Sequence, residues 1–143
     1  EAQRDTEEAV ATGAALRKLA EIVAAQGGDA RAVYDETLLP LAEEVREIRA
    51  ERGGYLHVSA LGLGKANVLL GGGRRRAGDA VDHAVGILLQ RRAGEKVREG
   101  DLLARVHCRS GAEEGVAAAK AAFTVSDAFE PRPLIYEFID WEE

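Results

Sequence analysis

The sequence predicts an α+β fold with a partly barrel-like sheet. Residue spacings typical of helices and of strands follow one another in the order helix, two strands, helix, two strands, helix, strand. Glycine-rich turns separate some of the strands, which indicates hairpin connections. This arrangement favours an α+β fold over a doubly wound parallel sheet.

The composition is that of an ordinary soluble globular protein. The chain has 143 residues, of which 46% are hydrophobic and 31% charged, enough for one domain with a real core. The net charge of −6 argues against nucleic acid or an anionic membrane as the main partner. The longest apolar runs are too short to cross a bilayer, and no signal-peptide pattern opens the chain. We therefore expect a cytoplasmic protein.

The single cysteine and the first residue each support one expectation. Cys108 has no partner for an internal disulfide, and a lone cysteine at the end of an apolar strand is expected to be packed rather than nucleophilic. The chain contains no methionine and starts with Glu1, so we expect an excised or processed piece of a longer protein. The alternative is a trimmed chain with its own separate function.

The first segment is predicted to be helical, over about Thr6–Ala25, and Gly27–Gly28 is predicted to end it. Asp29 is placed to cap a short helix that runs through Tyr34, and Leu39–Pro40 then breaks the chain. The predicted helix from Thr6 carries one apolar stripe, made of Leu16, Leu19, Ala20 and Val23.

A strand pair and a helix are predicted next. Val45–Arg49 is charged and irregular, which indicates a partly exposed strand, and Gly53–Gly54 is a turn before a second strand at Tyr55–Val58. Ser59 precedes a helix, which is predicted to end in a run of glycines and arginines. The apolar face of this helix consists of Leu63, Ala66 and Leu70.

The second half is predicted to be rich in strands. Ala84–Leu89 is nearly all apolar and is predicted to be a strand buried on both faces, whereas Leu102–His107 alternates and has one wetter face. Ser110–Glu113 has the pattern of a capping box for another helix. A last strand is predicted at about Leu134–Ile139. The predicted helix after the capping box has Val116, Ala119 and Phe123 on one face.

Several segments, taken in order, resemble the C-terminal region of pyrimidine-nucleoside (thymidine-type) phosphorylases. The resemblance spans nearly the whole chain. It implies that residues 1–41 are the helical end of a central α/β domain and that residues 42–143 are an α/β-hammerhead (barrel-sandwich-like) C-terminal domain. The segments that carry it are Gly13–Leu16, Val23–Asp29, Leu39–Pro40, Gly54–Leu56, Leu70–Arg74, Asp79, Asp82, Val85–Ile87, Gly94–Val97, Gly100–Asp101, Leu103–His107, Val125–Asp127 and Pro133–Ile135.

Enzymes of this family are pentosyltransferases in which phosphate attacks the anomeric carbon of a pyrimidine nucleoside. The products are the base and a (deoxy)ribose 1-phosphate. In the family, the N-terminal two-thirds of the enzyme contains the phosphate site, the base site and the helical domain that forms the dimer. No stretch of this sequence matches these parts. The resemblance therefore implies an architectural part of a homodimeric enzyme that meets phosphate and nucleoside only through the full-length protein. No catalytic residue, cofactor site or metal site is carried over.

Some alternatives concerning the substrate stay open. The preference between thymidine and uridine is not determined, and a related nucleotide phosphorylase that acts on AMP shares parts of this region. We expect the isolated chain to be inactive, since the family's catalytic residues lie in the part of the enzyme that has no match here.

One loop carries a functional hypothesis. The resemblance places Gly73, Arg74 and Arg75 near the edge of the cleft that closes over substrate. Arg74 or Arg75 would then hold the closed form or screen the charge of phosphate. In the alternative, the glycines form a tight turn and the arginines pair with Asp79, Asp82 or nearby glutamates, the usual outcome for clustered surface charges.

Other candidate residues favour structural interpretations. Asp79, Asp82 and His83 lack the second ligand cluster that a metal site needs. His57 and His107 are expected to be half-exposed strand residues, because no oriented partner is evident. Gly71–Gly73 follows a helix and precedes a strand, the reverse of the order in a phosphate-binding loop.

Two further classes of protein remain as alternatives. The spacing of Gly94, Val97, Gly100–Asp101 and Leu103 also resembles a biotinyl or lipoyl carrier domain. A carrier needs a lysine just after the next strand, where this chain has Cys108–Arg109–Ser110. The other alternative is a stand-alone interaction domain, which would expose a large apolar patch.

Overall fold

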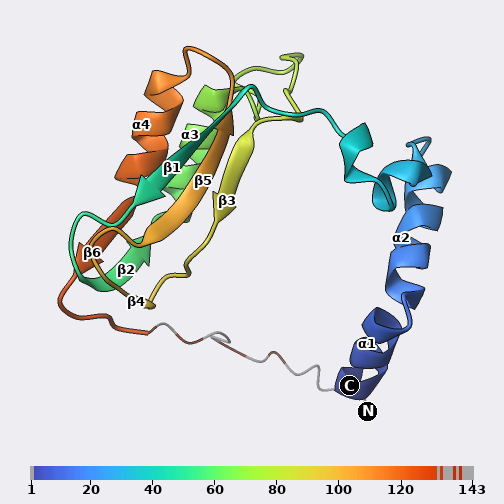
Figure 1. The fold of residues 1–143 in the computed structure, drawn as a ribbon, viewed down its shortest axis with the longest axis horizontal. Coiled ribbons are helices and arrows are strands. Elements are labelled where there is room, and N and C mark those ends of the chain that lie inside the picture. The colour runs from blue at the N-terminus through green and yellow to red at the C-terminus, as the bar shows by residue number, and fades with distance from the viewer. Residues whose placement is uncertain (1, 132, 134–136, 138, 140–143) are drawn as a thin grey trace. The chain divides into compact units, whose positions relative to one another are not determined.

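The computed structural model describes residues 2–131, 133, 137 and 139. Its described residues form two compact units, residues 1–40 and residues 41–143 (Figure 1). Most of the strand predicted at Leu134–Ile139 lies outside the described residues.

The first unit is helical. It contains α1 (Ala2–Ala11), α2 (Ala14–Ala25) and the 3₁₀ helices η1 (Ala30–Val33) and η2 (Glu36–Leu38). The prediction of one continuous helix from Thr6 to Ala25 is wrong, because Gly13 takes φ 71° and breaks it into α1 and α2. The predicted cap is confirmed: the Asp29 side chain accepts a hydrogen bond from the Arg31 amide at the start of η1.

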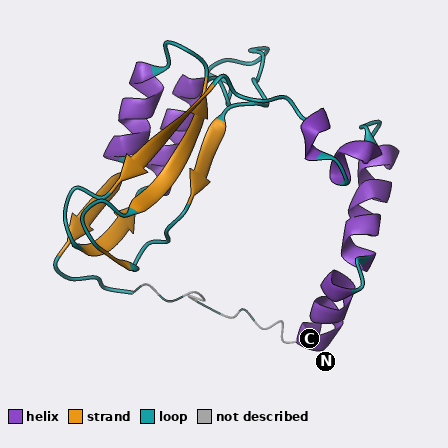
Figure 2. Cartoon of the chain, viewed as in Figure 1, coloured by secondary structure: helices purple, strands orange, loops and turns teal. Residues whose placement is uncertain are grey.

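The second unit combines two small antiparallel sheets with two helices, so the predicted mixed α+β character is confirmed (Figure 2). One sheet has the strand order β1-β5-β3 and the other β4-β2-β6. In Figure 1, α3 and α4 lie side by side on one side of the strands. The elements are β1 (Glu44–Arg49), β2 (Gly54–Val58), α3 (Ala60–Leu70), β3 (Gly86–Leu89), β4 (Lys96–Val97), β5 (Leu102–Cys108), α4 (Glu113–Ala121) and β6 (Phe123–Ser126).

The prediction that Val45–Arg49 and Tyr55–Val58 form a pair is wrong. The corresponding strands β1 and β2 belong to different sheets, and β1 pairs with β5 so that Glu44 lies opposite Cys108. The Gly53–Gly54 turn therefore carries the chain from one sheet to the other. The partial exposure predicted for β1 is confirmed, since Ile48 is buried while Arg46 and Glu47 are exposed.

Strand β3 is less buried than predicted. Leu88 and Leu89 are 53% and 43% exposed, so the prediction of burial on both faces is wrong. The reason is position, because among the described residues β3 lies at the edge of its sheet and pairs with β5 alone. An apolar run indicates a strand but does not show whether other elements will cover it.

The N-terminus of α3 has a side-chain cap, whereas that of α4 has none. The helix predicted after Ser59 is present as α3, and the Ser59 side chain caps it by accepting a hydrogen bond from the Gly62 amide at 3.1 Å. The capping box predicted at Ser110–Glu113 is wrong, because the residue before α4 is Ala112 and has no side-chain cap. The Ser110 hydroxyl instead donates to Glu44 of β1 at 3.3 Å.

The core lies between the helices and the two sheets. Phe123, predicted on a helix face, is the first residue of β6, yet it is buried in this core. Alanines let α3 and α4 approach each other closely, since Ala66 and Ala119 are both fully buried. The other large contributors to the core are Ile48, Leu56, Leu70, Val97, Leu103, Val106 and Cys108.

Candidate functional site

The loop Gly71–Asp82 leaves the end of α3 and is closed at its base by a backbone hydrogen bond. The Asp82 amide donates to the Gly71 carbonyl at 2.9 Å, which makes this segment an Ω-type loop with adjacent ends. Its first turn is held to α3, because the Gly72 amide donates to the Asn67 carbonyl and Asn67 Nδ2 donates to the Gly72 carbonyl. A Cβ on Gly72 would lie 2.5 Å from Asn67 Oδ1, so a larger residue here would displace the Asn67 side chain that binds this turn.

The tip of this loop exposes three arginines. Asp79 Oδ2 accepts hydrogen bonds from the backbone amides of Arg75 and Arg76, at 3.0 and 2.8 Å. The Arg74, Arg75 and Arg76 side chains are exposed and make no ion pair with Asp79 or Asp82. The tight glycine turn of the alternative is present, but its two aspartates have other partners: Asp79 binds the loop backbone and Asp82 binds a different arginine.

That arginine is Arg109, in the turn between β5 and α4. Its Nε donates to Asp82 Oδ2 at 2.7 Å and its Nη2 to Asp82 Oδ1 at 3.1 Å, a two-pronged contact. Its Nη1 donates to the Leu41 carbonyl at 3.2 Å. The side-chain hydrogen bonds from Arg109 lower the pKa of the Asp82 carboxyl, and Asp82 in turn raises the pKa of Arg109.

Glu43 stands on another side of the same arginine. Its Oε1 lies 3.9 Å from Arg109 Nη1, and its Oε2 accepts a hydrogen bond from the Ser110 amide at 2.9 Å. The Ser110 backbone amide is the main reason why the pKa of Glu43 is lowered. Arg109 is thus flanked by two carboxylates, and the nearer one, Asp82, takes the direct contact. Sequence reasoning did not predict this cluster, because its members come from segments far apart in the chain.

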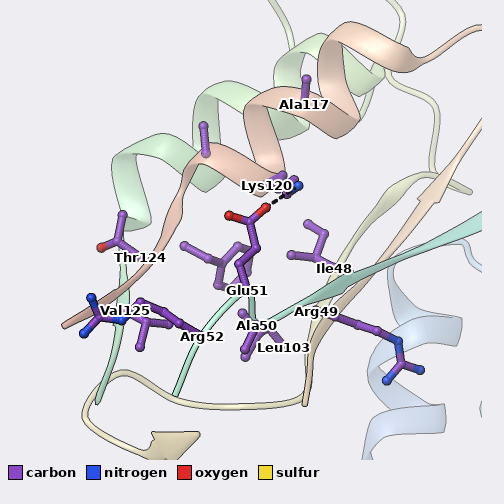
Figure 3. A pocket seen from close by; sticks show the side chains of 12 residues that line it. Ile48, Arg49, Ala50, Glu51, Arg52, Leu103, Ala117, Lys120, Thr124 and Val125 are labelled. Atoms are coloured by element: carbon purple, nitrogen blue, oxygen red, sulfur yellow. Dashed lines mark ion pairs between the residues drawn. The ribbon is translucent and has the colours of Figure 1, made fainter. Parts of the chain in front are cut away.

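A groove of about 540 Å³ runs beside α4 (Figure 3). Its mouth carries Glu51 and Lys120, whose charged atoms lie 2.6 Å apart, as the dashed line in Figure 3 marks. A smaller cavity of about 190 Å³ shares Ala117 and Lys120 with it and reaches Cys108 and Arg109. The apolar lining of the larger groove consists of Ile48, Ala50, Leu103, Ala117, Ala121, Phe123 and Val125.

The groove offers little for chemistry. Lys120 is paired with Glu51, Arg49 with Glu47 and Arg52 with Asp127. Each cation on the rim therefore already has a carboxylate partner, and the arrangement suits packing better than reaction. Sequence reasoning did not identify this groove, because its walls come from β1, α4 and β6.

The histidines predicted as half-exposed strand residues are confirmed in that role. His57 Nε2 lies 2.6 Å from Ser126 Oγ, and its ring packs at 5.3 Å from that of Phe129. The Ser126 hydroxyl donates to the Ala128 carbonyl, so it accepts from the His57 Nε2–H and is not activated as a nucleophile. His107 is half-buried on β5.

Cys108 is a packed residue, as predicted. Its side chain is 1% exposed, and burial raises the pKa of its thiol. A protonated, buried thiol is a poor nucleophile. The residues that follow it, Arg109 and Ser110, bind Asp82 and Glu43, and no lysine of a carrier domain stands in this turn.

The residues considered as metal ligands have other roles. Asp82 is bound to Arg109, and His83 is exposed. No group of three His, Cys, Asp or Glu side chains in the described part of the chain has the arrangement to hold a metal ion. Among the same residues, no helix has the length and hydropathy needed to cross a bilayer.

Comparison with known proteins identifies the second unit. Residues 56–126 match the family described as Pyrimidine nucleoside phosphorylase C-terminal domain. This range runs from β2 through β6 and includes both the Gly71–Asp82 loop and the Arg109 turn. The chain contains a pyrimidine nucleoside phosphorylase C-terminal domain.

Curated relatives agree with this assignment. The chain is 34% identical over 134 residues to proteins named "Pyrimidine-nucleoside phosphorylase" from Staphylococcus aureus strains USA300 and NCTC 8325 / PS 47. The match covers 92% of this chain and 31% of each relative. The chain therefore spans about a third of the length of the phosphorylases to which it is similar, and the predicted resemblance is confirmed at the level of this domain.

Proposed function

We propose that this chain is the C-terminal architectural part of a pyrimidine-nucleoside phosphorylase. The longer enzyme would cleave pyrimidine nucleosides with phosphate to release the base and a (deoxy)ribose 1-phosphate. The observation that supports this most is the family match over residues 56–126, together with relatives of which the chain covers 31%. In this proposal, residues 42–143 are the hammerhead-type domain and residues 1–41 the helical end of the preceding α/β domain.

The proposal assigns the chemistry to the remainder of the longer enzyme. Phosphorolysis needs cationic and hydroxyl donors that converge on phosphate, and groups that stabilise the departing base. The cations of the groove beside α4 are paired, and the Ser126 hydroxyl is committed to the Ala128 carbonyl. The isolated chain is therefore expected to be inactive, and the parent enzyme, a homodimer in this proposal, brings phosphate and nucleoside to its other domains.

The Gly71–Asp82 loop is the part of the chain proposed to act near substrate. Arg74 and Arg75 are exposed on a loop whose base is closed by the hydrogen bond from Asp82 to Gly71. In the parent enzyme, these cations would stabilise the closed form or screen the charge of phosphate. The side chains of these arginines form no ion pair with Asp79 or Asp82. This supports the role, since an arginine paired with a carboxylate would have less effect on an anion.

The test measures phosphate-dependent release of base from thymidine and uridine. The isolated chain, shown to be folded by circular dichroism, is expected to release none, whereas the longer chain that contains it is expected to be active. Activity of the isolated chain would contradict the assignment of chemistry to the other domains. Activity of the longer chain on AMP but on neither pyrimidine nucleoside would contradict the proposed substrate class.

The loop is tested in the longer enzyme with Arg74→Gln and Arg75→Gln, compared with Arg98→Gln on the β4–β5 turn. The loop variants are expected to raise the KM for phosphate by about threefold to tenfold, because a screening charge near an anion is lost. The control is expected to leave this KM unchanged. Unchanged turnover and phosphate affinity in both loop variants would end the functional interpretation of the loop.

A further inference from the structure

We infer that Arg109 is a positioning residue, which holds the base of the Gly71–Asp82 loop and thereby fixes where Arg74 and Arg75 are presented. Arg109 lies outside the loop in sequence and does not itself need to touch substrate. The part of this inference that concerns phosphate rests on the proposed function. The part that concerns the order of the loop stands on the contacts of this chain.

The contacts of the loop divide into internal and external ones. The hydrogen bonds from the Arg75 and Arg76 amides to Asp79 are internal, so they shape the tip but cannot place it relative to the rest of the unit. Placement comes from the two ends. Asn67 of α3 holds the first turn of the loop by donating to the Gly72 carbonyl. Arg109 holds the other end of the loop by donating to the carboxylate of its last residue, Asp82.

Asp82 is the point at which a change at Arg109 would reach the loop. Its amide donates to the Gly71 carbonyl at 2.9 Å and closes the base. Its Oδ1 accepts from the Ala84 amide at 3.0 Å, and both of its carboxylate oxygens accept from Arg109. Removing the guanidinium would leave the Asp82 side chain with the Ala84 amide alone among these partners, so the base of the loop would open more often.

The geometry favours arginine over lysine at this position. A guanidinium presents two parallel N–H groups to the two oxygens of one carboxylate, which fixes the carboxylate plane as well as its distance. A third donor, Nη1, reaches the Leu41 carbonyl at 3.2 Å. Lysine would keep the charge but could not hold Asp82 in a planar fork and reach Leu41 at the same time. Charge alone would therefore not replace Arg109.

The expected consequence is selective for phosphate. A loop that is already ordered loses little conformational freedom when its arginines meet an anion, whereas a loosened loop must be ordered at that moment. Loss of the Arg109 fork should thus raise the KM for phosphate more than the KM for nucleoside. A residue that only stabilised the fold would lower the amount of active enzyme without separating the two KM values.

The experiment compares Arg109→Lys and Arg109→Gln with Arg105→Gln. Arg105 lies on β5, the strand that ends just before Arg109, and is exposed, with its Nε 3.7 Å from Glu47 Oε1. First, hydrogen exchange is measured in this chain. Both Arg109 variants are expected to speed exchange of the Asp82 and Ala84 amides by roughly tenfold or more, while the β5 amides of Ala104 and Val106 stay protected. The Arg105 variant should change none of these rates.

Second, kinetics are measured in the longer phosphorylase. The Arg109 variants are expected to raise the phosphate KM by about threefold to tenfold, with a smaller change in the nucleoside KM. Unchanged exchange at Asp82 and Ala84 would overturn the positioning role, whatever the kinetics. Faster exchange with unchanged or equally raised KM values would overturn its link to phosphate. A longer chain without any phosphorolysis would refute the proposed function, while the exchange data would still decide the role of Arg109 in the loop.

Discussion

Gly115 of α4 lies so close to Leu70 of α3 that a Cβ on the glycine would be 2.7 Å from Leu70 Cδ2. The contact lies where the two helices pack, and Gly115 is buried there. Glycine is a poor helix former, so its presence in α4 is explained by packing rather than by helix propensity. The helix α3 contains a contrasting residue, Gly64, which has no atom within 4 Å of its would-be Cβ.

The two helix glycines are therefore expected to respond to alanine in opposite directions. Gly115→Ala should destabilise the chain by about 1–3 kcal/mol, because the added methyl overpacks the α3–α4 contact. Gly64→Ala should stabilise it by about 0.5–1 kcal/mol through helix propensity alone. Urea unfolding monitored by circular dichroism measures both. Equal effects of the two substitutions would contradict the packing explanation.

The cap of α3 should be worth a measurable amount of stability. Ser59→Ala removes the acceptor of the Gly62 amide and is expected to lower the free energy of unfolding by about 1 kcal/mol. Ser59→Asp keeps an acceptor and adds a charge favoured at a helix start, so it serves as the matched control. If both variants lost the same stability, the hydroxyl would be acting through some contact other than the cap.

The thiol of Cys108 should be unreactive in the folded chain. Burial raises its pKa above the ordinary value of 9.0, so the folded protein keeps a proton that the unfolded chain releases near that pH. Its contribution to stability is therefore present below pH 9.0 and decreases as pH rises above it. A thiol reagent at pH 8 is expected to label Cys108 only after urea is added. Rapid labelling of the native chain would show that the residue is accessible.

The carboxyl of Asp29 is expected to titrate unusually low. Hydrogen bonds from the Arg31 side chain, and then from the Arg31 amide, lower the pKa of Asp29 from an ordinary 3.8 to about 2. The stabilisation is present above pH 3.8 and is lost as pH falls through about 2. NMR titration of the Asp29 side chain measures this directly. Arg31→Gln should raise the pKa, whereas Arg17→Gln on α2 should leave it unchanged.

Local chemistry explains the features that sequence reasoning predicted correctly. Asp29 was predicted as a cap and Ser59 as the residue before a helix, because a cap needs only a short polar side chain and the amides that follow it. The packed state of Cys108 and the half-exposed positions of the histidines also followed from their neighbours in sequence. The family resemblance rested on ordered segments along the chain and is confirmed over residues 56–126.

Features that depend on a distant partner were missed. The strand prediction for β1 was correct, but its partner, β5, lies far along the chain. The burial of β3 was overestimated because its place at a sheet edge is a property of the whole sheet. The pattern at Ser110 predicted a helix cap. Instead, the Ser110 hydroxyl donates to Glu44 of β1, and the Ser110 amide donates to Glu43, the residue before β1.

The sequence by itself determined most of the helices and strands, the cap at Asp29 and the family, because backbone preferences, side-chain periodicity and short motifs are encoded in neighbouring residues. Only the tertiary structure decided the pairing of the strands, the groove beside α4 and the partner of Asp82. Arg109 reaches Asp82 across 27 positions of the chain, while Asp79, much nearer to the arginines of the loop, binds their backbone amides. Which charges meet is set by the packing of α3 against α4 and of β5 against β1, and proximity in sequence does not predict it.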